Sequence, residues 1–308
     1  MPQQQTDVRH LASAAVVVGV DGSEASDKAL DWAAGLAARR GRELRIVHGL
    51  DLEGMRQVYG RYDVWVPPVE DRLRAQGAAL VARCAQRVRE ARPQLRVETE
   101  MSPEAPSVLL KRHSATAYLT VLGARGTSGF LGHVGSILLS VTSHASGPVV
   151  VVRADPEAVD TVRDRGPVVV GVDGSAVSEA ALGAAFEEAA ERDTDLVAVH
   201  VWNDFSFGMF AGDPYLLFPV PDIEVAEQAV LAERLAGWQA KYPQVPVTRK
   251  VYPSGPASVL DTLSADAQLV VVGSRGRGGF TGLLLGSTSN SLVQHAHCPV
   301  MVVHPEKG

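Results

Sequence analysis

The chain alternates short apolar runs with longer segments whose apolar residues recur every three or four positions. Residues 15–20 and 149–152 are valine-rich runs, which are typical of parallel strands buried on both faces. After the first run, four apolar residues share the spacing of one helical face: Leu30, Ala33, Ala34 and Ala37. Gly41 is placed to end that helix.

The same alternation continues along the first half of the chain. We expect further strands at residues 44–47, 95–100 and 118–122. Helices are expected at 70–91 and 136–145. A further short helix is expected from Pro106 onward, since proline suits the first turn of a helix. Five strands with intervening helices predict an α/β fold, in which helices cover both faces of an open parallel sheet.

The second half of the chain repeats the first. Residues 16–23 and 168–175 are identical, at an offset of 152 positions, and further matching segments follow in the same order over about 140 residues. A duplicated domain is the reading that explains this order. The expected organisation is a tail at 1–14, a first domain at 15–153, a linker at 154–166 and a second domain at 167–305.

Composition narrows the class of protein. A net charge of −6 over 308 residues offers no basic surface for nucleic acid. No apolar run is long enough to span a membrane, and the first fifteen residues lack a signal-peptide pattern. Cys84 and Cys298 give neither a metal-binding spacing nor a disulfide framework. We therefore expect a cytoplasmic protein with two reduced thiols, bound to neither nucleic acid nor membrane.

The candidate chemistry lies in two loops at the carboxyl ends of strands, where open parallel sheets bind ligands. One loop follows the first strand of each copy, at Asp21 and Asp173. The other follows the fourth strand and in the second copy runs from Gly273 to Thr288, with glycines at 273, 276, 278, 279, 282 and 286. Glycines let backbone N–H groups approach a phosphate, and the helix start at its end favours an anion.

The spacing of this loop carries a resemblance to a known family. Gly273, Gly276, Gly286 and Ser287 form Gly-x2-Gly-x9-Gly-Ser, which resembles the ATP-binding motif of the universal stress proteins. The opening Val-Gly-Val-Asp-Gly-Ser and the closing Cys-Pro-Val-Met-Val-Val are also similar to that family. The resemblance implies two tandem Rossmann-like, five-stranded parallel-sheet sandwich domains of the adenine-nucleotide α-hydrolase-like type.

The resemblance also implies roles for individual residues. Beside the adenosine it places Gly19, Asp21, Gly171 and Asp173. At the end of the second strand, Val47 and Val199 would present backbone to the adenine edge, with Asp204 a weaker candidate for base or ribose. The segments that would wrap the phosphates are Leu122, Gly123, Ala124, Arg125, Gly126, Thr127 and Ser128, and Val272, Gly273, Ser274, Arg275, Gly276, Arg277 and Gly278. At the helix start, the outer phosphates would meet Gly135, Ser136, Gly286, Ser287 and Thr288. Mg²⁺ is expected to accompany the ATP.

The first copy departs from this motif. Only eight residues separate Gly126 from Gly135, and the missing one falls beside His133 and Val134. Because a shorter loop re-aims several N–H groups, the first site is predicted to bind ATP more weakly than the second. Comparing the Gly126→Glu and Gly276→Glu variants tests this order.

Other polar residues have an ordinary structural explanation. Arg125 and Arg275 could equally contact phosphate or solvent. His48 and His200, at the ends of the second strands, are more simply packed histidines than catalytic ones. The short cluster of His295, His297 and Cys298 lacks a fourth metal ligand.

No nucleophile elbow, His-Glu-x-x-His motif or Walker A lysine occurs in the chain. We therefore expect a nucleotide-dependent stress-response switch or sensor that is not an enzyme, with at most slow ATP hydrolysis. The alternative is an interaction or chaperone-like scaffold with a vestigial site.

Two surfaces suggest partners. The last strands, at 149–152 and 300–303, are apolar and expected at sheet edges, where an uncovered strand invites pairing. The resemblance implies that the two copies pair through these strands as an intrachain pseudo-dimer, with a homodimer of chains left open. The long connections 51–70 and 203–224 are expected to lack regular structure, and the aromatic residues of the second either close over a nucleotide or pack on the other copy.

Overall fold

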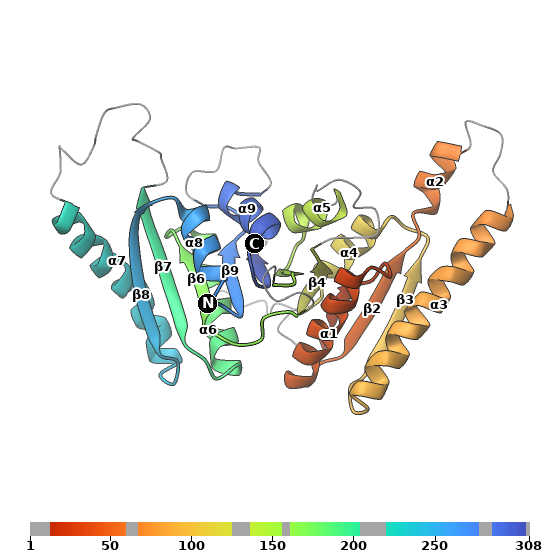
Figure 1. The fold of residues 1–308 in the computed structure, drawn as a ribbon, viewed down its shortest axis with the longest axis horizontal. Coiled ribbons are helices and arrows are strands. Elements are labelled where there is room, and N and C mark those ends of the chain that lie inside the picture. The colour runs from red at the N-terminus through yellow and green to blue at the C-terminus, as the bar shows by residue number, and fades with distance from the viewer. Residues whose placement is uncertain are drawn as a thin grey trace, which may run out of the picture. The chain divides into compact units, whose positions relative to one another are not determined.

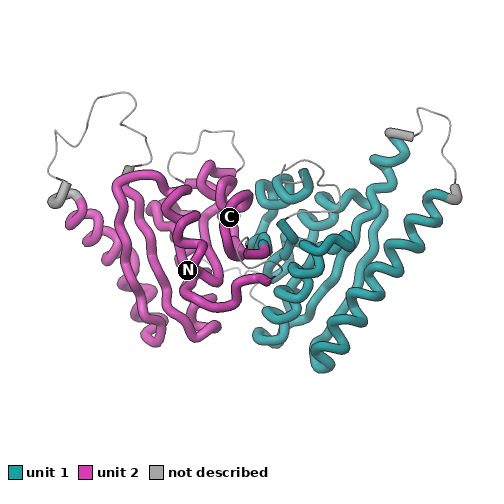
Figure 2. Tube along the Cα trace, in the orientation of Figure 1, with its two compact units in different colours: residues 1–153, 306–308 teal, residues 154–305 magenta. Residues whose placement is uncertain are grey.

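The structure is a computed structural model, and it describes residues 13–59, 67–124, 136–155, 161–203, 220–276 and 285–305. The chain divides into two compact units, one ending at Arg153 and the other running from Ala154 to Pro305 (Figure 2). Each unit is an α/β layer structure of its own, which confirms the expected fold class.

The first unit is a five-stranded parallel sheet in the order β3-β2-β1-β4-β5 (Figure 1). Its strands are β1 (Val16–Gly19), β2 (Leu44–Gly49), β3 (Val97–Ser102), β4 (Leu119–Gly123) and β5 (Val149–Val152). Its helices are α1 (Glu24–Arg39), α2 (Leu52–Tyr59), α3 (Pro67–Ala91), α4 (Pro106–Ser114) and α5 (Ser136–His144). Helices α1 and α3 cover one face, and α4 packs on the other beside α5.

The second unit repeats this plan in the order β8-β7-β6-β9-β10, again parallel. Its strands are β6 (Val168–Val172), β7 (Leu196–Asn203), β8 (Val247–Ser254), β9 (Leu269–Gly273) and β10 (Val300–Val303). Its helices are α6 (Ala176–Glu191), α7 (Val220–Lys241), α8 (Pro256–Ser264) and α9 (Ser287–His295). The order reverses between β6 and β9, as it does between β1 and β4 in the first unit.

Local sequence explains why these elements form. Val16, Val17 and Val18 are at most 1% exposed, as a strand between two helical layers requires. The Ser23 side chain caps α1 by accepting a hydrogen bond from the Ser26 N–H. Gly41 has a φ of +59° just beyond the helix, a conformation in which glycine has no Cβ penalty.

Several predicted boundaries are wrong. Strand β2 continues to Gly49 rather than ending at residue 47, because β3 extends alongside it to Ser102. The connection 51–70 contains α2, and α3 already begins at Pro67. In the second copy β7 reaches Asn203 and α7 begins at Val220, so both regular elements extend into the expected loop. The aromatic residues predicted there lie between 205 and 218, outside the described residues.

The two units hold their long helices against the first helix by different chemistry. In the first unit Arg87 of α3 forms ion pairs with Asp27 and Asp31 of α1. In the second unit Trp238 and Tyr242, on and just after α7, stack on Phe186 of α6. Trp238 Nε1 also donates to Glu179 Oε1 at 2.7 Å. The seam between the two helices is therefore ionic in one unit and aromatic in the other.

The described parts of the segment joining the units are bonded to each other and, at Gly166, to the second unit. Asp155 is 5% exposed and forms an ion pair with Arg163 at 2.8 Å. The Gly166 carbonyl accepts hydrogen bonds from Gln268 Nε2 at 2.6 Å and from Thr194 Oγ1 at 2.9 Å. Gly166 has a φ of +104°, so this turn requires glycine.

Candidate functional site

The loop after β6 is tightly organised around one carboxylate. Asp173 Oδ1 accepts a hydrogen bond from the Ser175 N–H at 2.9 Å. Ser178 Oγ accepts from the N–H groups of Asp173 and Gly174, at 3.3 and 3.0 Å. Ser175 in turn caps α6 by accepting from the Ser178 N–H. The aspartate is therefore held in one orientation at the carboxyl end of the strand.

The first unit builds the same loop from the same residue types. Asp21 Oδ1 accepts from the N–H and the hydroxyl of Ser23, at 2.9 and 2.6 Å. The Asp21 N–H donates to Ser26 Oγ at 3.4 Å. Two serines at a spacing of three thus fix this aspartate in both copies.

In the second unit the loop after β9 approaches this aspartate. A Cβ added to Gly276 would lie 2.5 Å from Asp173 Oδ2, so only glycine allows the present approach. The two loops that the sequence placed separately around a ligand therefore meet at Asp173 and Gly276. Both residues keep solvent access, and Arg275 beside them is exposed.

The start of α9 closes the same loop. The Gly286 N–H donates to the Ser274 carbonyl at 2.8 Å, and Ser289 Oγ donates to the Gly273 carbonyl at 2.6 Å. Gly286 stands at the N-cap position without a side-chain cap. The first N–H groups of a helix lack intrahelical partners, so this helix start, with the Ser287 and Thr288 hydroxyls, offers hydrogen-bond donors and a positive dipole end.

The histidines at the second strands are structural ties. His48 Nδ1 lies 2.7 Å from the Val20 carbonyl, and His200 Nδ1 lies 2.7 Å from the Val172 carbonyl. His200 Nε2 also lies 2.9 Å from Glu227 Oε2 on α7. Both histidines are thus bonded within the fold, as expected of packed or satisfied histidines, and they hold the end of the first strand against the second.

The structure places the predicted site residues unevenly. Gly19 is the last residue of β1 and Gly171 the last but one of β6. A Cβ added to them would meet Leu110 of α4 and Leu260 of α8, respectively. Leu122, Ala124 and Val272 are buried, so any ligand contact there comes from backbone. The residues of the prediction that lie outside the described part are Arg125, Gly126, Thr127, Ser128, Gly135, Asp204, Arg277 and Gly278.

Val47 and Val199 do not occupy strand ends, which corrects their expected position. Both side chains are 1% exposed, and the Val47 carbonyl accepts from the Val20 N–H at 3.0 Å. Because β2 and β7 continue beyond them, these two residues belong to the sheet ladder.

Sequence reasoning missed two features of the second unit. Ser274 is 1% exposed and its Oγ has no hydrogen-bond partner among the described residues, whereas the matching residue of the first unit is Ala124. Ser289 ties the helix start to the strand, where the first unit has Leu138. A position-by-position comparison of the two copies contains the signal for both.

The short cluster near the C-terminus makes local contacts, although the His297 ring nitrogen Nδ1 is buried without a hydrogen-bond partner among the described residues. His295 Nδ1 lies 3.0 Å from the Ser291 carbonyl, and the His297 N–H donates to Ser264 Oγ. Burial raises the pKa of Cys298 to about 12, which disfavours the thiolate that binds metals. No group of three or more metal-ligating side chains converges within the described residues.

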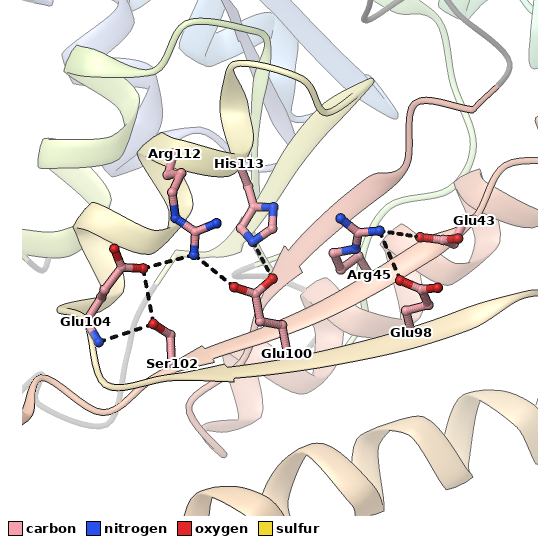
Figure 3. A network of polar contacts seen from close by, with 8 residues as sticks. All are labelled: Glu43, Arg45, Glu98, Glu100, Ser102, Glu104, Arg112 and His113. Atoms are coloured by element: carbon pink, nitrogen blue, oxygen red, sulfur yellow. Dashed lines mark hydrogen bonds and ion pairs between the residues drawn. The ribbon is translucent and has the colours of Figure 1, made fainter.

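Away from the loops, the first unit carries a polar network along β2, β3 and α4 (Figure 3). Arg112 forms ion pairs with Glu100 and Glu104 at 2.8 and 2.9 Å, and His113 Nε2 lies 2.8 Å from Glu100 Oε2. Burial lowers the pKa of His113. Burial works to raise the pKa of Glu100, but the hydrogen bond from Arg112 and the charge of His113 lower it overall.

Comparison with known proteins decides the family. The Universal stress protein family model matches residues 14–153 and again residues 165–304. The chain belongs to the universal stress protein family. Each unit corresponds to one matched segment, so this is a tandem universal stress protein. Membership of this family assigns the protein to the stress response.

The relatives of this tandem universal stress protein match nearly its whole length. A universal stress protein of Mycolicibacterium smegmatis is 41% identical over 297 residues, which are 94% of this chain and 97% of that protein. Universal stress protein Rv2005c of Mycobacterium tuberculosis is 40% identical over 292 residues, 93% of this chain and 96% of that protein.

A solved structure shares the fold. The crystal structure of a universal stress protein from Archaeoglobus fulgidus has a TM-score of 0.68 and 22% identity, and covers 96% of this chain and 97% of that one. In the described part of the chain, none of the helices has the length and hydropathy to cross a membrane.

Proposed function

We propose that the protein binds ATP at the carboxyl ends of β6 and β9, and more weakly at those of β1 and β4. The approach of Asp173 Oδ2 to Gly276 carries this proposal, since it brings a carboxylate and a glycine-rich backbone to one place. A carboxylate suits a ribose hydroxyl or an adenine amino group as an acceptor. Glycine backbone beside it can approach phosphate oxygens closely.

The start of α9 supports the phosphate end of this arrangement. Its uncapped first turn points N–H groups and a positive dipole end outward. Ser287 and Thr288 add hydroxyl donors, whereas the first unit has Ser136 and Ile137 at these positions. With Ser274 and Ser289 also lacking counterparts in the first unit, the second unit is the better-equipped site.

ATP bound here would contact both loops and so couple their positions. Ordering of the glycine-rich loop by the phosphates would change the surface beside α9, which is how a nucleotide-dependent switch presents its state to a partner. Mg²⁺ would arrive with the triphosphate and neutralise part of its charge. His200, the histidine nearest the loop after β6, is already engaged with Val172 and Glu227, which disfavours it as a base and fits slow hydrolysis at most.

Nucleotide content tests the proposal directly. Freshly purified protein is denatured, and the released nucleotide is identified by mass spectrometry and counted per chain. Mg-ATP titration by calorimetry then compares Gly276→Glu with Gly237→Glu. Gly237 lies on α7 with open space around its Cα, so the control adds the same carboxylate away from the site.

We expect bound ATP, loss of the tighter site in Gly276→Glu, and unchanged binding in Gly237→Glu. Loss of only the weaker site, or of neither, would overturn the assignment to the second unit. A chain that neither carries nor binds ATP would favour the alternative, a scaffold with a vestigial site. Phosphate released steadily over hours and lost in Gly276→Glu would add slow ATPase activity.

A further inference from the structure

A second candidate site lies in the first unit at the opposite end of the sheet from the glycine loops. A cavity of about 230 Å³ opens where α1 and α3 end and where β2 and β3 begin (lower end of both helices in Figure 1). Its apolar wall includes Ala37, Pro93 and Leu95, and three arginines line it: Arg42, Arg92 and Arg96.

The charge around this cavity is strongly positive and is confined to the first unit. Residues 39–45 and 89–96 together hold seven arginines and two glutamates. The matching segments of the second unit, 191–197 and 239–246, hold one arginine, one lysine and three carboxylates. This concentration stands out in a chain whose net charge is −6.

The three arginines differ in how they are held within the described residues. Arg42 donates to the Ala14 carbonyl at 3.0 Å and stacks over Tyr118. The side chains of Arg92 and Arg96 form neither ion pair nor hydrogen bond with any residue in the described ranges. Guanidinium groups prefer planar oxyanions, which they contact through two parallel N–H bonds.

Gly35 of α1 shows how closely the charges converge. A Cβ on Gly35 would lie 3.6 Å from both Arg39 Nη1 and Arg92 Nη2, so these two nitrogens lie within twice that distance of each other. The matching residue of the second unit is Glu187. Gly35, which has no side chain, thus lies near the guanidinium groups of Arg39 and Arg92, at the position where the second unit carries the Glu187 carboxylate.

Helix termination does not account for the arginines. Basic residues do stabilise the carboxyl ends of helices, but α6 and α7 end at the same places without this cluster. There Thr194, Tyr242 and Pro246 replace the three lining arginines, and Tyr242 stacks on Phe186. In the second unit an aromatic ring therefore stands at the position that Arg92 holds in the first.

We propose that this cavity binds a small organic oxyanion, a phosphate ester or carboxylate whose apolar part rests on Ala37, Pro93 and Leu95. Arg92 and Arg96 would bind the anionic group, and Arg42 would define the inner wall. The site is independent of the proposed ATP site. It gives the first unit a ligand of its own, since the second unit lacks the residues for one.

Pyrophosphate is the probe, titrated by calorimetry at constant ionic strength into the full chain carrying Gly126→Glu and Gly276→Glu. These two changes are introduced to abolish the proposed binding by the glycine loops, so that the remaining heat reports another site. Into this background we introduce Arg92→Gln, Arg92→Lys or Gly35→Glu, with Arg249→Gln on the exposed edge strand β8 as the control. Circular dichroism checks that each variant is folded, and succinate in place of pyrophosphate separates a dicarboxylate site from a phosphate site.

We expect one site per chain, weakened about tenfold or more by Arg92→Gln, since a charge-assisted hydrogen bond is lost. Gly35→Glu should weaken it likewise, because the new carboxylate would pair with Arg92. Arg92→Lys should retain part of the affinity, and Arg249→Gln all of it. Absence of binding by both probes, or binding indifferent to Arg92→Gln and Gly35→Glu, would overturn the proposal.

Discussion

The first glycine of each strand-four loop permits a close packing contact, and the two copies differ in how close it is. A Cβ on Gly123 would lie 2.5 Å from the Ala25 carbonyl oxygen and 2.9 Å from the Ser26 nitrogen, both in the backbone at the start of α1. A Cβ on Gly273 would lie 3.0 Å from Val177 Cγ1, a side-chain atom, and 3.1 Å from the Arg275 carbonyl oxygen, so its contacts are less close than those of Gly123. The perturbation is the pair of matched substitutions Gly123→Ala and Gly273→Ala.

The contacts set the expected magnitudes. Overpacking costs about 1–3 kcal/mol of unfolding free energy, and backbone that must move lies at the upper end of that range. Displacing the start of α1 also weakens the cap from Ser26 N–H to Ser23 Oγ, now 3.2 Å, which is worth about 1 kcal/mol. We therefore expect a loss of about 3 kcal/mol or more for Gly123→Ala and about 1 kcal/mol for Gly273→Ala.

Hydrogen exchange followed by mass spectrometry at increasing urea measures the stability of each unit separately, which a single unfolding curve of a two-unit chain does not. Peptides from β1 and β4 report Gly123→Ala, and those from β6 and β9 report Gly273→Ala. In each variant the other unit serves as the internal control. Equal losses in the two variants, or a larger loss for Gly273→Ala, would refute the packing argument.

Two further predictions concern titratable side chains. Burial lowers the pKa of His113 in the folded protein from its ordinary 6.5. The contribution of neutral His113 to the free energy of unfolding should therefore be complete above pH 6.5, and it should be lost as the pH falls through the pKa of the folded state. His113→Leu introduces the matching residue of the second unit (Leu263) and should remove this pH dependence from the free energy of unfolding measured in urea. A pH profile that is the same in the variant would contradict the prediction. Burial also raises the pKa of Cys84 and Cys298, so iodoacetamide should label both slowly in native protein and rapidly in urea; rapid native labelling of Cys298 would count against this.

The sequence predicts the valine-rich strands well because both of their faces are buried. Val16 to Val18 and Val149 to Val152 can only be strands inside a layered fold, and their repetition at 168 and 300 fixes two units. The edge strand β3 was harder to delimit, since Glu98, Thr99 and Glu100 face solvent and ion pairs rather than a core. Because β3 continues to Ser102, β2 pairs with it beyond Val47 as far as Gly49. The end of β2 therefore lies two residues later than expected.

The pattern of apolar and polar residues could not predict contacts between loops. Spacing indicated that Asp173 and Gly276 serve the same site, but their approach depends on how two turns are folded. The capping serines that orient the aspartates are visible in the sequence as Ser23 with Ser26 and Ser175 with Ser178. Helix α2, of eight residues, is too short for its apolar spacing to distinguish it from a loop.

The differing helix seams bear on how a duplicated chain reaches its native state. Tandem copies of one domain can exchange equivalent segments while folding. Gly183 lies against the Trp238 ring, and a Cβ there would come within 2.6 Å of it. The matching residue on α1 is Asp31, so α7 docked on α1 would press an indole against a carboxylate. With α3 docked on α6, Arg87 would meet Glu179 at the position of Asp27 but Gly183 at the position of Asp31. Each long helix therefore fits the first helix of its own unit better than the duplicate of that helix, a difference that disfavours crossed assembly of the newly made chain.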